Sequence, residues 1–283
     1  MIEFFTRAAT AAEAVSLRAA NSSAIYTAGA TDIGVKMYKG SLSAKGIIDI
    51  SKLRELKGID PENRGIGALT TFADILRAQA DTPELRLMKQ MAGQVAAAQI
   101  RNRATLGGNI ANANPAADSL PVLAVLDASV LLLSSGGERE LPLAAYLKLR
   151  REGDSAALLT RVRYEELPEK AGYAFFKVGR RENLAISRVS GCAALTVEEG
   201  RITWARLSLG AVSPVTDRFR ETEAAILGRP FCHDTLVMAG ARAEEEAYAY
   251  IGGRASAEYK LPVIRDLVPR LLSACKNESE GAI

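Results

Sequence analysis

The sequence predicts an α+β fold in two parts, an N-terminal part over residues 1–168 and a small C-terminal domain over residues 169–283. At 283 residues, the chain is long enough for two medium domains of about 150 residues each. Strand and helix patterns alternate through the first part, which predicts α/β layering, whereas three strand patterns followed by helices predict an α+β second part. Between them, the segment 165–172, which contains Pro168, has the composition of a linker.

Local patterns predict each element of the N-terminal part. A capping box at residues 10–13, Thr-Ala-Ala-Glu, begins a helix, and the turn Asp-Pro-Glu-Asn at 60–63 separates two short strands. Strands are expected at 24–27, 46–50, 64–67, 129–134 and 157–162. Helices are expected at 72–80, 84–98 and 120–126, and the charged segment 149–155 is expected to be a surface loop.

The C-terminal part begins with strand patterns at 173–178, 187–197 and 201–210, the last two joined by a turn at 198–200. Helices are expected at 220–227, 234–250 and 256–275. Because proline has no backbone N–H, Pro262 and Pro269 are expected to interrupt the last helix.

Charge and hydropathy exclude two classes of partner. The 36 basic and 33 acidic residues give a formal net charge of +3, and no run of Lys and Arg is longer than two, so nucleic acid is not expected as a partner. The longest apolar stretch, 120–133, contains Asp127 and is shorter than the roughly 20 residues that a membrane-spanning helix needs. Glu3 lies where a signal peptide would have basic residues, so we expect the protein to be located in the cytoplasm.

The cysteines and the single histidine argue against disulfides, a protein-bound metal and a catalytic Cys-His pair. Cys192, Cys232 and Cys275 are odd in number and far apart, which predicts reduced thiols rather than disulfides. One histidine, His233, cannot supply a histidine-rich metal site, so no protein-bound metal is expected. We expect His233 and Cys232 to lie at a helix start or in a loop, because no G-x-S-x-G motif accompanies them. A glycine-rich chain with few catalytic side chains suggests a protein that holds a cofactor.

Two glycine loops are the candidate binding segments. The first, 26–34, follows a predicted strand, so its small residues could let backbone N–H groups approach a diphosphate, with a helix N-terminus adding its positive dipole end. The second, 104–112, contains the pair Gly107 and Gly108, which we expect to expose consecutive amides, and Thr105, Asn109 and Asn112 add hydrogen-bonding groups. The alternatives are a tight turn for the first loop and a polar surface loop for the second.

Two neighbouring segments have simpler interpretations. Asp118 is expected to be the N-cap of the helix that follows it. The segment 65–70, Gly-Ile-Gly-Ala-Leu-Thr, has threonine where a dinucleotide fingerprint has its third glycine, and no strand-helix unit with a later acidic residue follows it. The sequence therefore does not predict a Rossmann site.

Six blocks in order resemble the FAD-binding medium subunit of the molybdenum hydroxylases, the family of xanthine dehydrogenase and carbon monoxide dehydrogenase. In the N-terminal part these are A-G-A-T-D at 28–32, I-G-A-L-T-T at 66–71 and T-L-G-G-N at 105–109, the last continued by N-P-A-A-D at 114–118. In the C-terminal part they are F-K-V-G-R-R-E at 176–182, L-G-A-V-S-P at 209–214 and R-A-S-A-E-Y-K at 254–260. The matches span nearly the whole chain.

The resemblance implies a PCMH or vanillyl-alcohol-oxidase type FAD-binding domain of two subdomains, about 1–57 and 58–168, followed by the small α+β domain with a three-stranded sheet and helices. It implies FAD with its diphosphate on the two glycine loops, and no catalytic residue in this chain. The implied cofactor-binding residues are Tyr26, Thr27, Ala28, Gly29, Ala30, Thr31, Asp32, Ile33, Thr105, Gly107, Gly108, Asn109, Asn112, Asp118, Leu158 and Lys177. Leu158 and Lys177 are the two implied to lie near the flavin ring.

The implied function is electron transfer within an oxidoreductase complex that is active only when assembled. A molybdopterin-binding large subunit would oxidise the substrate, a small subunit would carry [2Fe–2S] clusters, and this chain would pass electrons from them through FAD to an acceptor such as NAD. Two alternatives remain open: a self-sufficient FAD-dependent oxidoreductase, and a cofactor-free assembly protein of the same fold. The second alternative arises because Ala30 replaces a glycine of the family pattern, and alanine is disfavoured wherever a positive φ is needed.

Overall fold

The computed structural model describes residues 2–153, 156–181 and 185–280. The chain forms two compact units whose segments alternate along the sequence. Unit 1 comprises Met1–Asp81, Val95–Asn114 and Ala128–Glu165, and unit 2 comprises Thr82–Gln94, Pro115–Asp127 and Glu166–Ile283. The division into domains at residue 168 remains a prediction.

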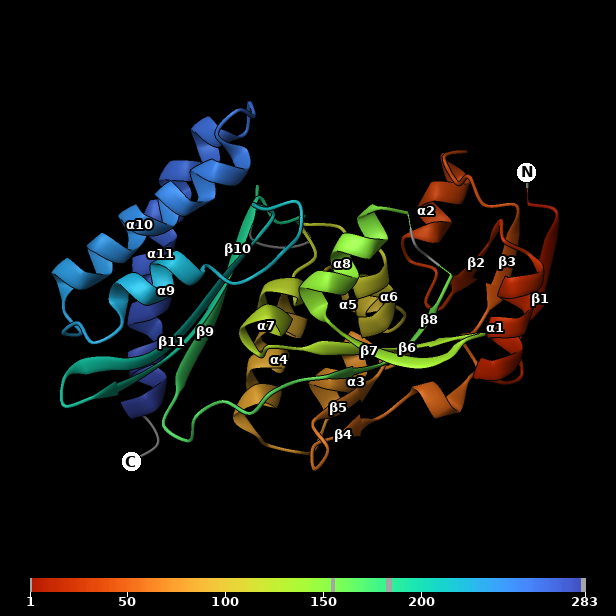
Figure 1. The fold of residues 1–283 in the computed structure, drawn as a ribbon, viewed down its shortest axis with the longest axis horizontal. Coiled ribbons are helices and arrows are strands. Elements are labelled where there is room, and N and C mark those ends of the chain that lie inside the picture. Colours follow the sequence, from red (N-terminus) through yellow and green to blue (C-terminus); the bar gives the residue numbers. More distant parts are fainter. Residues whose placement is uncertain (1, 154–155, 182–184, 281–283) are drawn as a thin grey trace. The chain divides into compact units, whose positions relative to one another are not determined.

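Unit 1 begins with a small parallel sheet, coloured red and orange in Figure 1, in the order β1-β3-β2. Its strands are β1 (Phe4–Arg7), β2 (Ala24–Thr27) and β3 (Gly46–Asp49), with α1 (Ala11–Ala20) and α2 (Ile33–Tyr38) in the connections. Thr10 is the N-cap of α1, because its hydroxyl accepts a bond from the Glu13 N–H, as the sequence predicts. Parallel strands need such helical crossovers, so β2 feeds directly into the turn that precedes α2.

The second sheet of unit 1 has five antiparallel strands in the order β4-β5-β8-β6-β7. They are β4 (Ile59–Asp60), β5 (Gly65–Gly67), β6 (Ser129–Ser134), β7 (Gly137–Pro142) and β8 (Leu158–Arg163). The short helices of this unit are η1 (Arg54–Leu56), α3 (Phe72–Arg77), α5 (Ala98–Arg101), α6 (Leu106–Ala111) and α8 (Leu143–Arg151). Helix α8 includes residues 149–151, so the expected loop at 149–155 is wrong over these positions; residues 154–155 lie outside the described residues.

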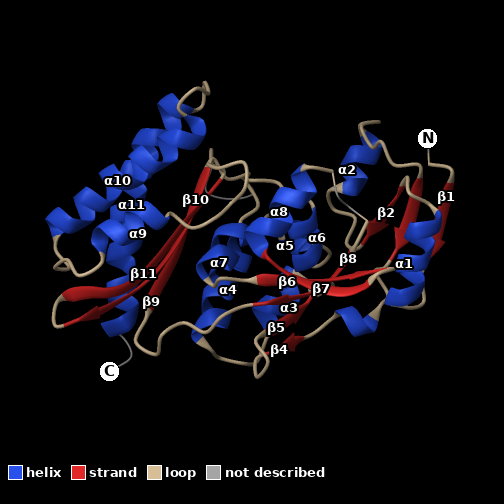
Figure 2. Cartoon of the chain, in the orientation of Figure 1, coloured by secondary structure: helices blue, strands red, loops and turns tan. Residues whose placement is uncertain are grey.

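Unit 2 is built on an antiparallel sheet of β9 (Gly172–Val178), β10 (Val189–Glu198) and β11 (Arg201–Gly210), in the order β11-β10-β9. Figure 2 shows the helices α9 (Arg220–Ile226), α10 (His233–Ile251) and α11 (Ala257–Glu280) on one face of the sheet. Apolar side chains of these helices and of the sheet form a buried core. The helices α4 (Pro83–Gln94) and α7 (Ser119–Val125) contact the sheet from the segments that unit 2 draws from earlier in the chain.

Helix α11 is continuous through Pro262 and Pro269, so the predicted interruption is wrong. A β-carbon on Gly240 of α10 would lie 3.0 Å from the Pro269 ring and 2.2 Å from the Arg265 carbonyl oxygen. Glycine therefore lets α10 approach α11 at the turn where proline removes a helical hydrogen bond. Burial of residues such as Leu271 and Cys275 against the sheet compensates for the lost bond.

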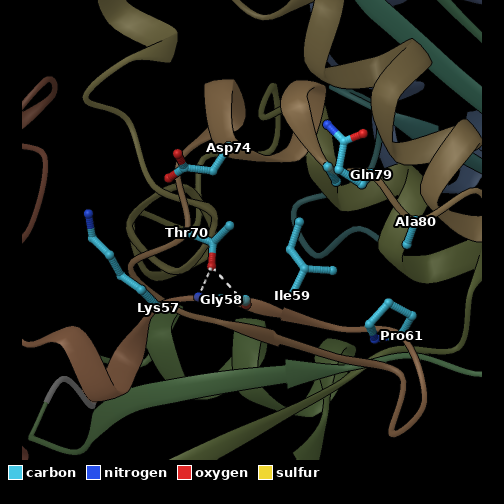
Figure 3. A pocket seen from close by; sticks show the side chains of 9 residues that line it. Lys57, Gly58, Ile59, Pro61, Thr70, Asp74, Gln79 and Ala80 are labelled. Carbon is cyan, nitrogen blue, oxygen red and sulfur yellow. Dashed lines mark hydrogen bonds between the residues drawn. The ribbon is translucent and has the colours of Figure 1, made fainter.

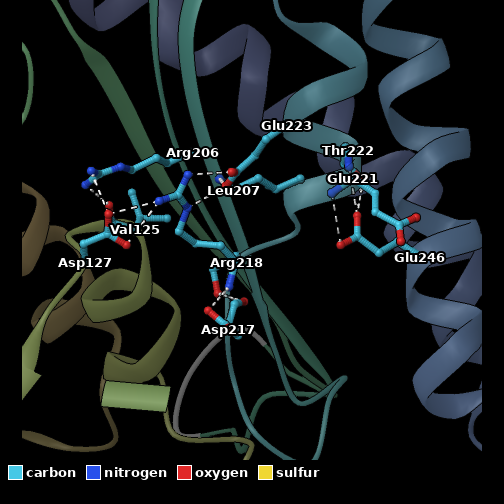
Figure 4. A network of polar contacts seen from close by, with 11 residues as sticks. Val125, Asp127, Arg206, Leu207, Asp217, Arg218, Glu221, Thr222, Glu223 and Glu246 are labelled. Carbon is cyan, nitrogen blue, oxygen red and sulfur yellow. Dashed lines mark hydrogen bonds and ion pairs between the residues drawn. The ribbon is translucent and has the colours of Figure 1, made fainter. Parts of the chain in front are cut away.

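A network of charged side chains connects the end of α7 to β11 and α9 within unit 2 (Figure 4). Arg218 lies 3.0 Å from the carboxylate of Asp127 and 2.7 Å from that of Glu223, and Arg206 lies 2.8 Å from Asp127. Glu223 also accepts the backbone N–H of Leu207. Because these charges are mutually paired, the network fixes the loop before α9 without any ligand.

Candidate cofactor site

The first glycine loop presents a run of unbonded backbone amides. Among the residues that the structure describes, no acceptor is found for the N–H groups of residues 29–32. Ala30 has a left-handed φ of 59°, and Asp32 is right-handed with φ −95°. Successive amides in alternating conformations make an anion-binding concavity. The loop therefore has free donors for an anion, as the first sequence interpretation requires.

Thr27 adds a second unsatisfied group at the base of this loop. The residue is 7% exposed at the end of β2, and its hydroxyl has no hydrogen-bond partner among the described residues. A buried hydroxyl without a partner costs free energy, so such a group in a native protein calls for an explanation such as a missing ligand or water. Both observations, in the same loop, fit an oxygen-rich cofactor.

Gly29 is needed for close packing of two chain segments. A β-carbon at Gly29 would lie 1.8 Å from the carbonyl oxygen of Arg103, in the turn that precedes α6. No side chain fits at that distance, so only glycine lets the first loop lie against this turn. The two predicted binding loops are therefore neighbours within unit 1.

The second glycine loop differs from its prediction. The N–H of Gly107 donates to the Ala68 carbonyl at 2.9 Å, and the N–H of Gly108 donates to the Thr105 hydroxyl at 3.1 Å. The expectation of consecutive exposed amides is wrong, because Thr105 caps α6 and the 66–71 segment takes the other donor.

The two glycines of this loop have different surroundings. A β-carbon on Gly107 would lie 2.5 Å from the Ala68 β-carbon, so Gly107 is a packing residue. Gly108 is exposed, and its β-carbon would meet one atom of the described residues within 4 Å, the Thr105 hydroxyl oxygen, at 2.8 Å. Of the pair, Gly108 is the residue that leaves room for a ligand beside α6.

Lys36 was not predicted as a site residue, and its side chain in α2 bonds to the end of α6. Its ammonium group lies 2.7 Å from the Asp32 carboxylate and donates to the Asn112 side-chain oxygen at 3.1 Å. The i, i+4 spacing of Asp32 and Lys36 was the available sequence signal. This contact brings Asn112 to the first loop.

Two further predicted residues of unit 1 are Tyr26 and Leu158. The Tyr26 hydroxyl donates to the Ala156 carbonyl at 3.2 Å, and burial raises its pKa to about 12 against a smaller opposing effect of Arg18. Leu158 is buried at the start of β8, in an apolar cluster with Ile48. Its side chain therefore belongs to the core of unit 1.

Asp118 and Lys177 form a buried ion pair in unit 2. Their charged atoms are 2.5 Å apart, and their side chains are 7% and 11% exposed. The Ser187 hydroxyl donates to the second carboxylate oxygen of Asp118 at 2.5 Å, and Lys177 also donates to the Gln94 carbonyl at 3.0 Å. The predicted N-cap bond of Asp118 is absent from α7, because these two partners take its carboxylate oxygens. Sequence reasoning missed Ser187, for which no local pattern exists.

One cavity of unit 1 lies apart from these residues (Figure 3). Its volume is about 550 Å³, and it is lined by Lys57, Gly58, Ile59, Pro61, Thr70, Asp74, Ala78, Gln79 and Ala80. The Thr70 hydroxyl, which lines this cavity, accepts a hydrogen bond from the N–H of Gly58 and donates one to the Gly58 carbonyl. These polar groups of the cavity wall are therefore already bonded within the protein. None of the predicted cofactor residues is among its lining residues.

The described residues contain no cluster of three or more His, Cys, Asp or Glu side chains that could hold a metal ion. Nor does the described part of the chain include a helix of the length and apolarity needed to span a bilayer.

Comparison with known proteins matches both parts of the chain. The family described as "FAD binding domain in molybdopterin dehydrogenase" matches residues 1–165, and the family described as "CO dehydrogenase flavoprotein C-terminal domain" matches residues 174–275. The chain belongs to this flavoprotein family. Its cofactor is FAD, and it is an oxidoreductase subunit of the xanthine and CO dehydrogenase type.

Individual relatives agree with this assignment. The putative xanthine dehydrogenase FAD-binding subunit of Escherichia coli K12 is 31% identical over 288 residues, covering 99% of this chain and 98% of the relative. The nicotinate dehydrogenase FAD-subunit of Eubacterium barkeri is 29% identical over 262 residues, covering 90% of this chain and 88% of the relative. The solved carbon monoxide dehydrogenase of Hydrogenophaga pseudoflava has the same fold, with a TM-score of 0.90, 24% identity and 98% of each chain covered. The predicted fold class is confirmed.

Proposed function

We propose that this chain is the electron-transfer subunit of a molybdenum hydroxylase complex. In this proposal a molybdopterin-binding large subunit oxidises the substrate, a small subunit carries [2Fe–2S] clusters, and this chain delivers their electrons to an acceptor such as NAD. When bound, FAD supplies redox chemistry that can exchange electrons with one-electron clusters and with a two-electron acceptor. Relatives named as the medium chain of carbon monoxide dehydrogenase support a multisubunit assembly.

The observation that carries the proposal is the run of four unbonded amides at residues 29–32, with the orphaned Thr27 hydroxyl beside it. These groups fit a diphosphate, because several N–H donors can point at one anion without moving. We assign diphosphate binding to residues 27–32, and not to the amides of Gly107 and Gly108, whose donors are used within the protein. Gly108 contributes open space for the cofactor.

The Asn112 side chain of the second loop is proposed to donate to the sugar-like part of FAD. The Asn112 oxygen accepts from Lys36, so its NH₂ group is the part left for a ligand hydroxyl. Asn109 and Thr105 are proposed to line the same path, although the Thr105 hydroxyl also caps α6. Tyr26 and Ile33 are proposed to contribute shape, and the polar group of Tyr26 is already bonded. The Leu158 side chain is buried in the core, so any contact of this residue with the cofactor is proposed to come from its backbone.

The Asp118–Lys177 pair is proposed to act on the flavin ring, following the resemblance. The Lys177 ammonium has three donors, of which Asp118 and Gln94 use two, so one remains for a ligand acceptor. Asp118 and Ser187 hold this ammonium in place, which keeps a positive charge at a fixed position. A fixed positive charge near the ring stabilises an added negative charge and so raises the tendency of the ring to accept electrons.

The partner requirement separates this function from a self-sufficient flavoenzyme. The chain should be purified alone and together with co-expressed neighbouring subunits, and the visible flavin absorbance followed after adding xanthine or an aldehyde. Bleaching only with the partners supports the proposal, and bleaching with the chain alone favours the self-sufficient enzyme. A colourless chain that also fails to take up added FAD favours the assembly protein. We include the cytoplasm in the proposal, since all three cysteines are free thiols.

A further inference from the structure

The proposed diphosphate loop contains a carboxylate as well as anion-binding amides. The N–H groups of residues 29–32 have no acceptor among the described residues, and the Thr27 hydroxyl at the base of the loop is buried and has no partner there. The last of these four residues is Asp32, whose side chain is 47% exposed. A carboxylate repels the phosphoryl oxygens that the neighbouring amides attract. The loop therefore needs a cation beside Asp32 if it is to accept a diphosphate.

Lys36 supplies this cation from α2. Its ammonium nitrogen lies 2.7 Å from a carboxylate oxygen of Asp32, and the two residues are four apart, the spacing that brings side chains together on one face of a helix. Asp32 is the N-cap residue of α2, but its side chain makes no capping bond to the helix. Over the described ranges, Lys36 is the only partner of the Asp32 carboxylate.

A second contact holds the Lys36 ammonium at this place. It donates to the side-chain oxygen of Asn112, the C-cap residue of α6, at 3.1 Å. Ion pairs between half-exposed side chains are usually weak, because two long side chains must be ordered in water to form them. The bond to Asn112, 76 residues further along the chain, fixes the ammonium between the two glycine loops. The positive charge is therefore kept beside Asp32.

We infer that Lys36 is a positioning residue for FAD, which cancels the charge of Asp32 and so allows the loop of residues 27–32 to accept the diphosphate. The Asp32–Lys36 pair has no net charge, so the cofactor meets the free backbone amides without net repulsion from the loop. This role rests on the proposed placement of the diphosphate on residues 27–32. It also assigns opposite effects to the two side chains, because Lys36 favours FAD binding and the Asp32 carboxylate opposes it.

The test is fluorescence titration of the apo-protein with FAD. Lys36→Met leaves the Asp32 carboxylate unpaired and should weaken FAD binding by about tenfold, because a diphosphate brings two negative charges close to it. Asp32→Asn removes the carboxylate and should tighten binding. The double variant restores the zero net charge of the pair and should bind FAD within about threefold of the wild-type chain. A pair with a purely structural role gives another pattern, since either single substitution breaks it and both would weaken binding.

Lys39→Met is the matched control. Lys39 is the C-cap residue of the same helix, is exposed, and has no ion pair or side-chain hydrogen bond within the part of the chain that the structure describes. Its substitution removes one positive charge while leaving the Asp32–Lys36 pair intact, so FAD affinity should stay unchanged. Thermal unfolding checks that each variant is folded, and we expect little change because half-exposed ion pairs contribute little to stability.

Weaker binding in Lys36→Met, tighter binding in Asp32→Asn and near-wild-type binding in the double variant would support the role of Lys36. These differences should shrink at about 1 M salt, where the screening length is about 3 Å. Weaker binding in both single variants, unchanged binding in Lys36→Met, or a double variant as weak as Lys36→Met would overturn it.

An equal loss of affinity in Lys39→Met would also overturn the role, because any positive charge on α2 would then serve as well as Lys36. A wild-type chain that binds FAD, with affinities that do not differ among the variants, contradicts the role of Lys36 alone and leaves the proposed function standing. A wild-type chain that binds no FAD contradicts both.

Discussion

Gly29→Ala is expected to abolish tight FAD binding while leaving the rest of unit 1 folded. The new β-carbon would lie 1.8 Å from the Arg103 carbonyl oxygen, whereas ordinary contacts between such atoms are about 3.4 Å or longer. The loop must therefore move by more than 1 Å, which exceeds the range of about 0.5 Å over which hydrogen-bond lengths vary. Charge-assisted bonds from two amides are worth about 1.5–3 kcal/mol each, so their loss weakens FAD binding by at least 100-fold.

Gly34→Ala is the matched control for this prediction. Gly34 lies five residues further along, in α2, and its β-carbon would meet no atom of the described residues within 4 Å. Alanine there should leave FAD affinity unchanged and stabilise the helix by up to about 1 kcal/mol. Affinity is measured by fluorescence titration of the apo-protein with FAD, and folding by thermal unfolding. A Gly29→Ala variant that binds FAD as tightly as Gly34→Ala would refute the assignment of the diphosphate to this loop.

Three further predictions concern the same loops and the buried pair. Ala30→Gly should bind FAD equally or more tightly in the same titration, since glycine adopts the left-handed conformation at position 30 without the cost of about 1–2 kcal/mol that alanine has. Clearly weaker binding would mean that the loop depends on the methyl group. Gly107→Val should lower thermal stability through collision with Ala68, whereas Gly108→Val should mainly lower bound flavin, and the reverse order would contradict their assigned roles. Asp118→Ala should lower the free energy of unfolding, measured with denaturant, by about 3–5 kcal/mol, because it leaves the buried Lys177 ammonium without its carboxylate partner. A loss near 1 kcal/mol would instead match a simple N-cap.

Local signals in the sequence were sufficient for most of the fold. The strands at 129–134 and 201–210 have the predicted bounds. The first is an apolar run, the second alternates apolar with polar residues, and both end at turn residues. β7 (Gly137–Pro142) was not predicted, since its residues are polar and mostly exposed, and its pairing with β6 comes from the tight turn between them. The continuous α11 was mispredicted because the packing of Pro269 against Gly240 is a tertiary contact that no local rule contains.

For the site, sequence reasoning found the segments but not the roles of individual atoms. It identified both glycine loops, yet the partners of Gly107 and Asp118 lie in distant segments, at Ala68 and at Lys177 and Ser187. A glycine pair looks the same in sequence whether it exposes amides or packs against a neighbour. The replacement of a family glycine by Ala30 pointed to a real feature of the backbone, because Ala30 has a left-handed φ, a conformation that glycine adopts freely.

We propose that this FAD-binding chain relays electrons only within a complex. The most direct measurement is the visible flavin absorbance of the purified chain, recorded with candidate substrates in the absence and presence of the co-expressed neighbouring subunits. We expect the purified chain to contain an equimolar amount of bound FAD, to show no bleaching by xanthine or an aldehyde when alone, and to show bleaching once the partners are present. Bleaching of the isolated chain by substrate, or a folded chain that cannot bind FAD, would contradict it.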